Sequence, residues 1–451
     1  MGEKKKIVMS VAGSDSSAGA GIQADLKTFN ALGLHGITVI TCVTAQNTIG
    51  VKSIHRVPVK NIEEQIDKAM EDMKPVAVKT GMLYDSDIVK SVAKKIKQYD
   101  LKAVVDPVMT ATSGDFLSKN NFANTIKKEL LESAYILTPN TYEASVLTDI
   151  KIQDIDDVKK ACQELYKTGN KSILIKGGHL KGKNAQDVFY DGENYSVFSL
   201  PKITNKKAHG SGCTLSALIT GYVALGEKPV YAVKRAKYVL WNMIKKGYNP
   251  GKGIDVLNHD SKIIKEIPYS FPTDKHFNLW LELNESVANL LSFLESEYIA
   301  EVGMNFGYAL PFAKKIEEIC AINGRIVKTN EKPILCGFLD FGVSKHIASI
   351  ILTAMSFDRE FRCAVNIKYS DKIIEKCKKL DLKIGSFDRR KEPKKVKSTM
   401  EWGTKDVIKK LGYAPDIIYD KGSIGKEPMI RILGKKSNEV VNKARSIIKK
   451  S

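Results

Sequence analysis

The stretch HGSGCTLSALITGY, residues 209–222, joins a glycine-rich turn to an apolar helical pattern. Free backbone N–H groups at the start of a helix attract an anion, and glycines such as Gly210 and Gly212 let the backbone approach it closely. A phosphoryl group in transfer is an anion of this kind. A helix start also lowers the pKa of a nearby thiol, so one interpretation of Cys213 is a thiolate base or nucleophile. A small cysteine that only packs in the core is the other.

The length and composition of the chain predict a globular protein of two or three domains. It has 451 residues, of which 43% are hydrophobic. No apolar run reaches the roughly 18 residues of a membrane span, and the opening MGEKKKIVMSVAGSD has too short an apolar run for a secretory signal. The seven cysteines are scattered and form no C-x-x-C pair, which argues against a disulfide framework or a zinc site. We therefore expect a cytoplasmic protein without a membrane partner.

The formal net charge of +20 is large, and much of it lies late in the chain. Residues 371–451 hold 23 Lys and Arg against 11 Asp and Glu. Nucleic acid is one partner that such a charge would suit. The lysines are spread out, however, with little aromatic surface between them, which favours a solvated face with sites for phosphorylated metabolites. We expect no nucleic-acid partner.

Short apolar runs alternate with helical patterns up to about residue 255. The runs rich in β-branched residues are 6–13, 36–46, 76–82, 102–109, 134–140 and 172–178. This alternation predicts a mainly parallel sheet with helices on both faces. Ligands bind beside the carboxyl ends of the strands in such a sheet, and Gly13, Asp106, Asn140 and Lys176 stand near these ends.

A segment with several glycines and prolines ends this alternation. We predict a first domain over 1–258, a linker over 259–273 and a second domain over 274–451. After a helical stretch at 277–296, runs punctuated by glycine resume, which predicts a second α/β or α+β domain.

An ordered set of motifs in the first domain resembles hydroxymethylpyrimidine kinase/hydroxymethylpyrimidine phosphate kinase of thiamine biosynthesis, a branch of the ribokinase-like kinases. The motifs are VAGSDSSAGAGIQADLKTFNALG, TAQNT, VKTGML, VVDPVM, LTPNTYEA, IKGGHL and HGSGCTLSALI. The resemblance covers roughly residues 5–255 and implies a three-layer α/β/α fold. It also implies two successive ATP-dependent phosphorylations of 4-amino-5-hydroxymethyl-2-methylpyrimidine. Ala18 departs from the family, which usually has glycine there, and Ser211 replaces a common threonine.

The resemblance implies roles for individual residues. Cys213 stands where sugar kinases of the superfamily keep a catalytic aspartate, and it would take the proton from the substrate hydroxyl. The second phosphorylation attacks with an anionic phosphate oxygen, so a weak base would suffice for both steps. Mg²⁺ would lie near Asp106 and Glu143, held through water, because it prefers oxygen ligands. The other contacts to ATP and phosphate would be Asn140, Lys176, His209, Gly210 and Gly212.

Five further residues would surround the pyrimidine according to the same resemblance. They are Gly13, Asp25, Gln46, Met82 and Val108. Gln46 would pair its amide with a ring nitrogen and the amine, and Met82 would lie against the ring. Structural roles are the alternatives: a helix cap or exposed charge for Asp25, a core position for Met82 and turn stabilisation for His209.

Basic residues in the second domain repeatedly stand close to glycine. Arg325 and Lys426 each follow a glycine directly, and His346 comes shortly after another. Glycine lets a backbone approach a ligand, and arginine forms forked bonds to phosphate, so this pattern predicts a site for phosphorylated ligands. Surface charge is the alternative for the pair Arg389-Arg390, and a capping or packing role is the alternative for His346.

The motifs VGMNFGYALP, NGRIVKT, FGVSKHIASIILTAMSFD, AVNIKYS, IGSFDRRKEP, EWGT and GKEPMIRILG resemble the archaeal-type thiamine-phosphate synthase domain, over about residues 275–450. The resemblance implies condensation of hydroxymethylpyrimidine diphosphate with thiazole phosphate and release of pyrophosphate. Arg325 would grip phosphate, and His346 would stabilise the leaving group or act as an acid. Further contacts would be Asn305, Asn366, Arg390 and Lys426. Relatives of both domains tend to self-associate, so we expect a homo-oligomer.

Two rival functions stay open at the level of sequence. A related vitamin kinase, such as a pyridoxal kinase, is the first. The second is a ligand-sensing role for the C-terminal domain, because similar domains are fused to DNA-binding segments in transcription regulators. Fusion to a kinase, the lack of a clear helix-turn-helix pattern, and the presence of Arg325 and His346 favour catalysis.

Overall fold

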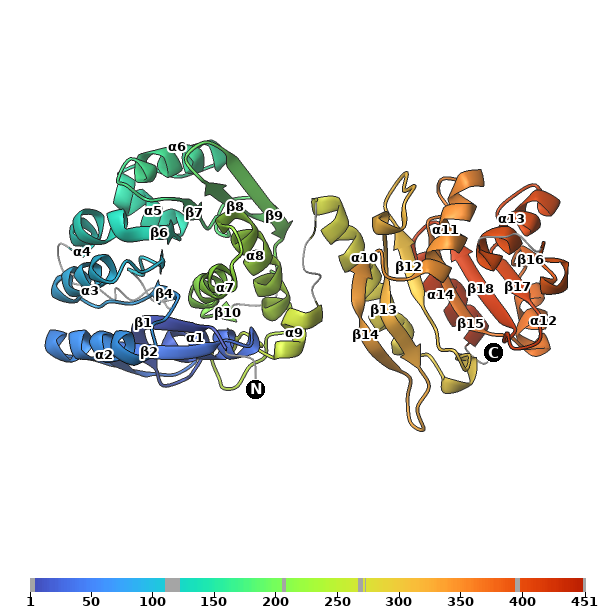
Figure 1. Cartoon of the computed structure of the whole chain (residues 1–451), viewed down its shortest axis with the longest axis horizontal. Coiled ribbons are helices and arrows are strands. Elements are labelled where there is room, and N and C mark those ends of the chain that lie inside the picture. The colour runs from blue at the N-terminus through green and yellow to red at the C-terminus, as the bar shows by residue number, and fades with distance from the viewer. Residues whose placement is uncertain are drawn as a thin grey trace. The chain divides into compact units, whose positions relative to one another are not determined.

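The computed structural model of the chain divides into two compact units, Met1–Ile264 and Lys265–Ser451 (Figure 1). It describes residues 5–109, 122–204, 208–266, 271, 273–393 and 398–448. The linker that we predict over 259–273 includes 267–270 and 272, which lie outside the described residues. None of the helices in the described ranges is long and apolar enough to span a bilayer.

The described strands of the first unit form one large sheet in the order β3-β2-β1-β4-β5-β6-β7-β8-β9. Their bounds are β1 Ile7–Asp15, β2 His35–Gln46, β3 Val51–Arg56, β4 Ala77–Thr80, β5 Ala103–Val105, β6 Ala134–Leu137, β7 Ile173–Ile175, β8 Asn184–Tyr190 and β9 Tyr195–Pro201. Neighbours from β2 to β7 are parallel, whereas β3, β8 and β9 add antiparallel pairs. The mainly parallel sheet that the sequence predicts is therefore confirmed.

Helices cover both faces of this sheet. They are α1 Gly21–Ala31, α2 Val59–Asp72, α3 Ser86–Gln98, α4 Phe122–Thr125, α5 Thr141–Thr148, α6 Ile155–Tyr166, α7 Ser211–Leu225, α8 Pro229–Lys245 and α9 Ser261–Glu266. The segment after α4 continues as a π-helix, Ile126–Leu130, and a 3₁₀ turn, Leu131–Ser133. In Figure 1, α2, α3 and α4 lie on one side of the sheet, and α7 and α8 lie on the other. This is the three-layer α/β/α fold that the resemblance implies.

Two helices show why the layers form. The buried residues of α2 are Ile62, Ile66 and Ala69, spaced so that one apolar stripe faces the sheet. In α7, every residue from Thr214 to Ala224 is buried, because this helix packs on β1, β4 and β5 and is covered by α1 and α8. A helix that is apolar on all sides belongs inside the protein. The start of α7 is thereby fixed against the sheet. Strand β10, Ala208–His209, comes just before this start in the chain and pairs in parallel with β11, Asp255–Val256.

The second unit has a sheet in which almost all neighbours are antiparallel. The described strands follow the order β14-β13-β12-β15-β18-β17-β16, and only β16 and β17 are parallel. The bounds are β12 Phe306–Ala309, β13 Ile319–Val327, β14 Ile334–Phe341, β15 Cys363–Lys368, β16 Ile384–Ser386, β17 Ile417–Asp420 and β18 Met429–Gly434. Of the two classes that the sequence leaves open, this antiparallel sheet defines α+β.

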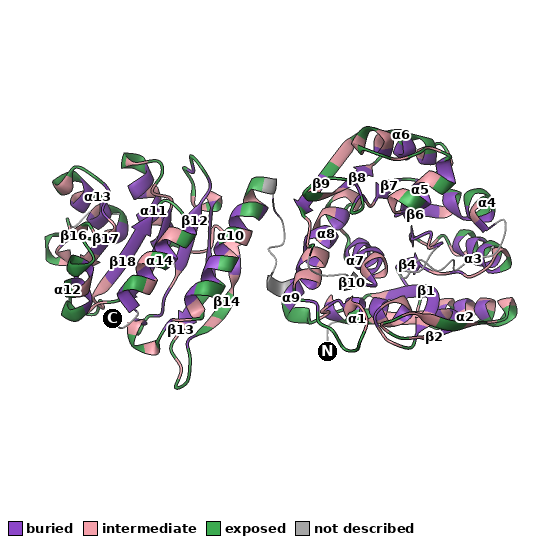
Figure 2. Cartoon of the chain, turned by 180° about the vertical axis from the view of Figure 1, so that it is seen from behind, coloured by how far each residue is buried: buried purple, intermediate pink, exposed green. Residues whose placement is uncertain are grey.

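Helices also cover both faces of the second sheet. They are α10 Asp274–Leu291, α11 Lys345–Phe357, α12 Asp371–Lys379, α13 Thr399–Leu411 and α14 Ser437–Ile448, with 3₁₀ turns at Ser296–Tyr298, Ile316–Glu318 and Arg389–Lys391. Side chains of α11 and α13 form one core with the sheet, and α10 and α14 pack together on the other face. Figure 2 shows the strands of both units largely buried and the outer faces of the helices exposed.

Glycine does not interrupt the second sheet in the way that its sequence suggests. Strand β13 passes through Gly324, and β14 passes through the paired Gly337. Both have positive φ, +127° and +119°, and a Cβ at Gly324 would come within 2.0 Å of the Cys336 carbonyl oxygen. The two glycines let the strands approach closely at this point. Gly324, which separates apolar runs in the sequence, therefore lies in the middle of the paired strands β13 and β14.

Candidate active site

A cavity of about 470 Å³ lies in the first unit beside the carboxyl ends of the parallel strands. Because these strands run in one direction, the residues that follow them meet at one edge of the sheet. Twelve of the residues that we expect in the kinase site line the cavity: Gly13, Gln46, Met82, Asp106, Val108, Asn140, Glu143, Lys176, His209, Gly210, Gly212 and Cys213. Residues from separate sequence motifs therefore line the same cavity.

The start of α7 forms one wall of this cavity. Gly210 precedes the helix with φ +82°, and a Cβ there would lie 1.9 Å from the Gly19 carbonyl oxygen. Only glycine lets these two turns pack together. The Thr214 N–H donates the first hydrogen bond of the helix, to the Gly210 carbonyl. The N–H groups of residues 211–213 come before this bond and point out of the helix start. They form the anion-binding feature that the glycine-rich turn predicts.

Cys213 stands in the first turn of α7 and is half-buried. Burial raises the pKa of its thiol, Lys79 lowers it, and the Asp25 and Asp106 carboxylates raise it again, so the pKa lies above its usual value. The expectation that this pKa is lowered is wrong, because the loss of water on burial outweighs the effect of Lys79. The thiol is therefore protonated at neutral pH.

Three charged side chains face one another across the strand ends. Lys176 Nζ lies 2.8 Å from Asp106 Oδ1 and 4.0 Å from Glu143 Oε2. Burial lowers the pKa of Lys176, but Asp106 and Glu143 raise it, with a net rise that keeps the lysine charged. Burial raises the pKa of Glu143 to about 7, although Lys176 acts in the opposite direction. A cation and a carboxyl group that titrates near neutrality thus share this end of the cavity.

Asn140 and Glu143 also hold the start of α5. Asn140 Oδ1 accepts from the Glu143 N–H at 2.8 Å, and Glu143 Oε2 accepts from the Asn140 N–H at 2.7 Å. This reciprocal capping box explains the N-x-x-E spacing independently of any ligand. The two side chains serve the helix and line the cavity at once.

The carboxylates of Asp106 and Glu143 fit a magnesium ion that is held through water. Asp106 Oδ1 already accepts a hydrogen bond from Lys176 Nζ, and Glu143 Oε2 accepts one from the Asn140 N–H. Within the described residues no group of three or more His, Cys, Asp or Glu side chains is placed to hold a metal directly. Mg²⁺ keeps several waters and binds with few carboxylates, which suits two partly engaged groups.

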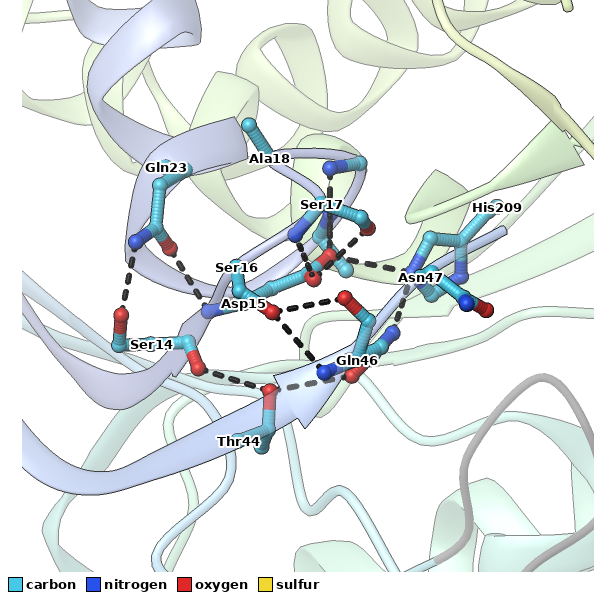
Figure 3. A network of polar contacts seen from close by, with 12 residues as sticks. Ser14, Asp15, Ser16, Ser17, Ala18, Gln23, Thr44, Gln46, Asn47 and His209 are labelled. Carbon is cyan, nitrogen blue, oxygen red and sulfur yellow. Dashed lines mark hydrogen bonds and ion pairs between the residues drawn. The ribbon is translucent and has the colours of Figure 1, made fainter. Parts of the chain in front are cut away.

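Asp15 is a central residue of the site, although it is not among the site residues that the sequence predicts. Figure 3 shows its carboxylate amid hydrogen bonds from Ser17, the turn after it and His209. Burial raises the pKa of Asp15, but the hydrogen bonds from His209, Ser17 and the Ala20 N–H lower it to about 2. The carboxylate is thus ionised. Its place inside the motif SDSSAG is the signal that could have identified it.

An apolar wall from α8 completes the cavity. Leu240, Trp241 and Ile244 line it together with Leu200 of β9. Next to them, Lys237 Nζ lies 2.6 Å from Asp187 Oδ2 in a buried ion pair. In the sequence these apolar positions have the ordinary spacing of a core face, so no signal distinguishes them from residues that only pack.

Asp25 is not among the residues that line the cavity. Its fully buried carboxylate accepts hydrogen bonds from Lys79 Nζ at 2.8 and 2.9 Å and from Ser10 Oγ at 2.6 Å. Burial raises its pKa, while Lys79 lowers it. The contact between Asp25 and the pyrimidine stays a prediction.

In the second unit, Asn305, Asn366 and Arg325 come from three neighbouring segments of the sheet. Asn366 Oδ1 accepts from the Asn305 N–H at 2.7 Å, and Asn305 Nδ2 donates to the Gly324 carbonyl at 3.2 Å. Gly324 directly precedes Arg325, whose exposed guanidinium donates to the Val302 carbonyl. These predicted contacts therefore lie close together at one end of the sheet.

The arginine pair at 389–390 is divided between the interior and the surface. Arg389 Nε lies 2.6 Å from Asp420 Oδ1, and Arg431 Nη1 lies 2.7 Å from Asp420 Oδ2. The Asp420 side chain is fully buried and that of Arg389 nearly so, which rules out the alternative of a surface charge for Arg389. Arg390 is exposed and pairs with Asp388 at 2.8 Å.

The remaining predicted residues of the second unit are exposed to different degrees. Lys426 is half-exposed, and its Nζ lies 3.9 Å from Glu392 Oε2. His346 is exposed in the first turn of α11. Their roles toward a ligand stay predictions.

A mainly parallel sheet between two helical layers, with an anion-binding helix start and a lysine at the strand ends, is the architecture of the ribokinase-like kinases. Residues 15–258 match the family model of phosphomethylpyrimidine kinase, and residues 282–446 match that of thiamine-phosphate synthase ThiN. The chain is 35% identical over 451 residues to the bifunctional thiamine biosynthesis protein ThiDN of Methanocaldococcus jannaschii, with 98% of each chain covered. It belongs to this family of fused kinase and ThiN-type proteins.

Two further similarities concern the first unit alone. Over 253 residues the chain is 41% identical to the hydroxymethylpyrimidine/phosphomethylpyrimidine kinase of Bacillus subtilis, covering 56% of this chain and 93% of that one. The pyridoxal kinase of Staphylococcus aureus, solved with AMP-PCP and pyridoxal, superposes with a TM-score of 0.53 and 32% identity, covering 57% of this chain and 95% of that one.

Proposed function

We propose that the first unit uses ATP to phosphorylate 4-amino-5-hydroxymethyl-2-methylpyrimidine twice, and that the second unit joins the diphosphate to thiazole phosphate. The products are thiamine phosphate and pyrophosphate. The observation that carries this proposal is the match over 98% of both chains to a bifunctional thiamine biosynthesis protein. The pyridoxal kinases share the fold of the first unit, but the family model that matches it is that of phosphomethylpyrimidine kinase.

The geometry of the cavity suits transfer of a phosphoryl group. Such a transfer spreads negative charge over the migrating group, and catalysis consists mainly of positioning and of stabilising that charge. Lys176 and the free N–H groups of residues 211–213 supply positive ends on one side. Mg²⁺, held through water by Asp106 and Glu143, would neutralise phosphate charge when bound. The apolar wall formed by Leu240, Trp241 and Ile244 suits the flat base of the nucleotide.

Cys213 takes the proton of the substrate hydroxyl in the first phosphorylation. Because burial raises the pKa of its thiol, only the small thiolate fraction accepts this proton at neutral pH. The attacking hydroxyl loses its proton late in a loose transition state, so a small fraction suffices. The second phosphorylation attacks with a phosphate oxygen that is already anionic, and it needs no such acceptor.

The second unit needs positive groups for a different purpose. In the condensation the bond between the pyrimidine methylene and oxygen breaks, and pyrophosphate departs with the electron pair. Arg325 presents exposed forked donors beside the polar pair of Asn305 and Asn366, which suits a phosphate or pyrophosphate. His346 donates a proton or hydrogen bond to the departing group.

The product profile of the full chain tests this proposal. Purified protein with hydroxymethylpyrimidine, thiazole phosphate and Mg-ATP should yield thiamine phosphate. Accumulation of the diphosphate alone would favour a ligand-sensing second unit, and a strong preference for pyridoxal would contradict the kinase assignment. Self-association is a further prediction, and light scattering after size-exclusion chromatography measures it.

A further inference from the structure

The ring nitrogen Nε2 of His209 faces two partners, one of which requires a hydrogen-bond donor and the other an acceptor. His209 Nε2 lies 3.2 Å from Asp15 Oδ2 and 2.7 Å from Gln46 Nε2 (Figure 3). A carboxylate oxygen needs a donor opposite it, whereas an amide nitrogen needs an acceptor. One ring nitrogen cannot be both, so the donor and acceptor atoms of this network have to be assigned from its other contacts.

Asp15 decides the state of the histidine nitrogen. Its Oδ1 accepts from the Ser17 N–H and hydroxyl, both at 2.8 Å, and its Oδ2 accepts from the Ala20 N–H at 2.7 Å. A carboxylate in this setting is an acceptor only. His209 Nε2 therefore carries a hydrogen, and the neutral tautomer protonated there and the imidazolium both meet this requirement.

The atom of Gln46 that faces this N–H must then be its oxygen. An amide NH₂ group pointing at this N–H would set two donors against each other at 2.7 Å in a partly buried place, and the amide group would lack an acceptor there. Exchanging the amide oxygen and nitrogen of Gln46, a rotation of half a turn that leaves the shape unchanged, turns the 2.7 Å contact into a hydrogen bond from His209 to Gln46.

Thr44 gives an independent test of the same assignment. Its hydroxyl has one hydrogen, which it donates to the Ser14 carbonyl at 2.9 Å. Its other contact, 3.3 Å to the far atom of the Gln46 amide, must then have Thr44 as the acceptor. That far atom has to be the amide nitrogen. Thr44 and His209 thus require the same orientation from opposite ends of the amide.

The main chain of Gln46 is also held in place. Its N–H donates to Ser16 Oγ at 2.9 Å, and the Ser16 hydroxyl donates to its carbonyl at 2.7 Å. The side chain lines the cavity, so a fixed backbone and a fixed amide present one order of groups to a ligand. The oxygen stands on the His209 side, and an N–H stands on the Thr44 side.

We propose that Asp15 and His209 are positioning residues that lock the amide of Gln46 in one orientation and so make the site specific for an aminopyrimidine. The ring amine donates to Gln46 Oε1 on the His209 side, and the adjacent ring nitrogen accepts from Gln46 Nε2 on the Thr44 side. A heterocycle without an amine beside its ring nitrogen satisfies only one of these groups. The proposal rests on the proposed kinase function and adds the origin of its selectivity.

The test compares hydroxymethylpyrimidine with its 4-deamino analogue in the full chain. His209→Phe keeps a ring but removes the donor, so the amide of Gln46 is free to turn. The ratio of kcat/KM for the two substrates should fall about tenfold, mainly through the KM of the amine-bearing substrate, while the KM for ATP stays within about twofold. His209→Gln, which restores an N–H at this place, should recover most of the ratio.

Thr44→Val is a second variant that removes the other constraint without touching the glycine-rich turn, and it should lower the same ratio. The matched control is His259→Phe, since His259 contacts Thr214 and does not line the cavity. That control should leave the ratio unchanged.

An unchanged ratio in both His209→Phe and Thr44→Val would overturn the proposal. So would a loss in His209→Phe that is equal for both substrates and accompanied by a raised KM for ATP, because His209 would then contact phosphate instead. Failure of the wild-type chain to phosphorylate hydroxymethylpyrimidine would overturn the proposed function itself, which separates the two failures.

Discussion

The two sheets of the molecule collect polar residues in different ways. In the first unit, parallel strands bring residues at or near the ends of β1, β2, β4, β5, β6 and β7 to one edge, where they line one cavity together with the start of α7. In the second unit, strand direction alternates, so one end of the sheet combines the starts of β12 and β18 with the ends of β15 and β17. In the first unit, a polar motif at the end of a strand therefore predicts a residue at the functional edge. In the second unit, the end of a strand can lie at either end of the sheet, so the same position predicts no site.

The largest expected effect separates the two units. Lys176→Met removes the cation between Asp106 and Glu143, and both phosphorylations should slow about a thousandfold, as for loss of a main electrostatic group. Condensation of added diphosphate with thiazole phosphate should continue at the wild-type rate. Steady-state rates of the two half-reactions measure this difference.

Arg325→Ala is the opposite change, because this exposed guanidinium belongs to the second unit. Condensation should fall at least a hundredfold while both phosphorylations stay intact. Parallel loss of both activities in either variant would show that the two sites do not act independently.

The third prediction concerns the buried centre of the second unit. Asp420→Asn removes the charge that two buried arginines, Arg389 and Arg431, share. Breaking a buried pair from one side costs about 3–5 kcal/mol of unfolding free energy, because it leaves charge without compensation. Denaturant unfolding should show this loss in the second unit, and the kinase rates serve as the control for the first. A loss below 1 kcal/mol would mean that water reaches this cluster.

The fourth prediction uses the raised pKa of the Cys213 thiol. Its thiolate fraction grows about tenfold per pH unit below that pKa, so the rate of the first phosphorylation should rise with pH between about 6.5 and 8.5. The ratio of first to second phosphorylation isolates this effect, because Glu143, with a pKa of about 7, acts on both steps.

Cys213→Ala should remove the pH dependence of that ratio and slow the first step about a hundredfold more than the second. Equal losses in the two steps, or a ratio that does not change with pH in the wild type, would exclude the thiol as the proton acceptor.

The smallest expected effect tests a local departure from the family. Ala18 has φ +56°, a left-handed conformation that disfavours residues with a Cβ. Ala18→Gly should raise the unfolding free energy of the first unit by about 0.5–1 kcal/mol, and Ala18→Val should lower it. Denaturant midpoints measure both. Destabilisation by glycine would show that the freedom it adds to the unfolded chain outweighs the relief of strain.

Much of the first unit follows from its sequence because the alternation of strands and helices fixes both the sheet and its functional edge. The raised pKa of Cys213 does not follow, since the loss of water around a side chain depends on the whole packed site. The β8–β9 hairpin had a usable signal in the Asp191-Gly192 turn between two alternating runs.

In both units, contacts between residues far apart in the chain could not be predicted from the sequence. Asp15 and His209 are 194 positions apart, and Arg389 and Asp420 are 31 apart. No local pattern says that the first arginine of the 389–390 pair is buried and the second exposed. Such pairings depend on strand register, which short motifs do not encode.

A crystal structure with hydroxymethylpyrimidine and a non-hydrolysable ATP analogue tests the phosphoryl-transfer site most directly. We expect the terminal phosphate within hydrogen-bond distance of the N–H groups of residues 211–213, and the substrate hydroxyl between it and the Cys213 sulfur. Ligands bound away from the start of α7 would contradict the kinase assignment.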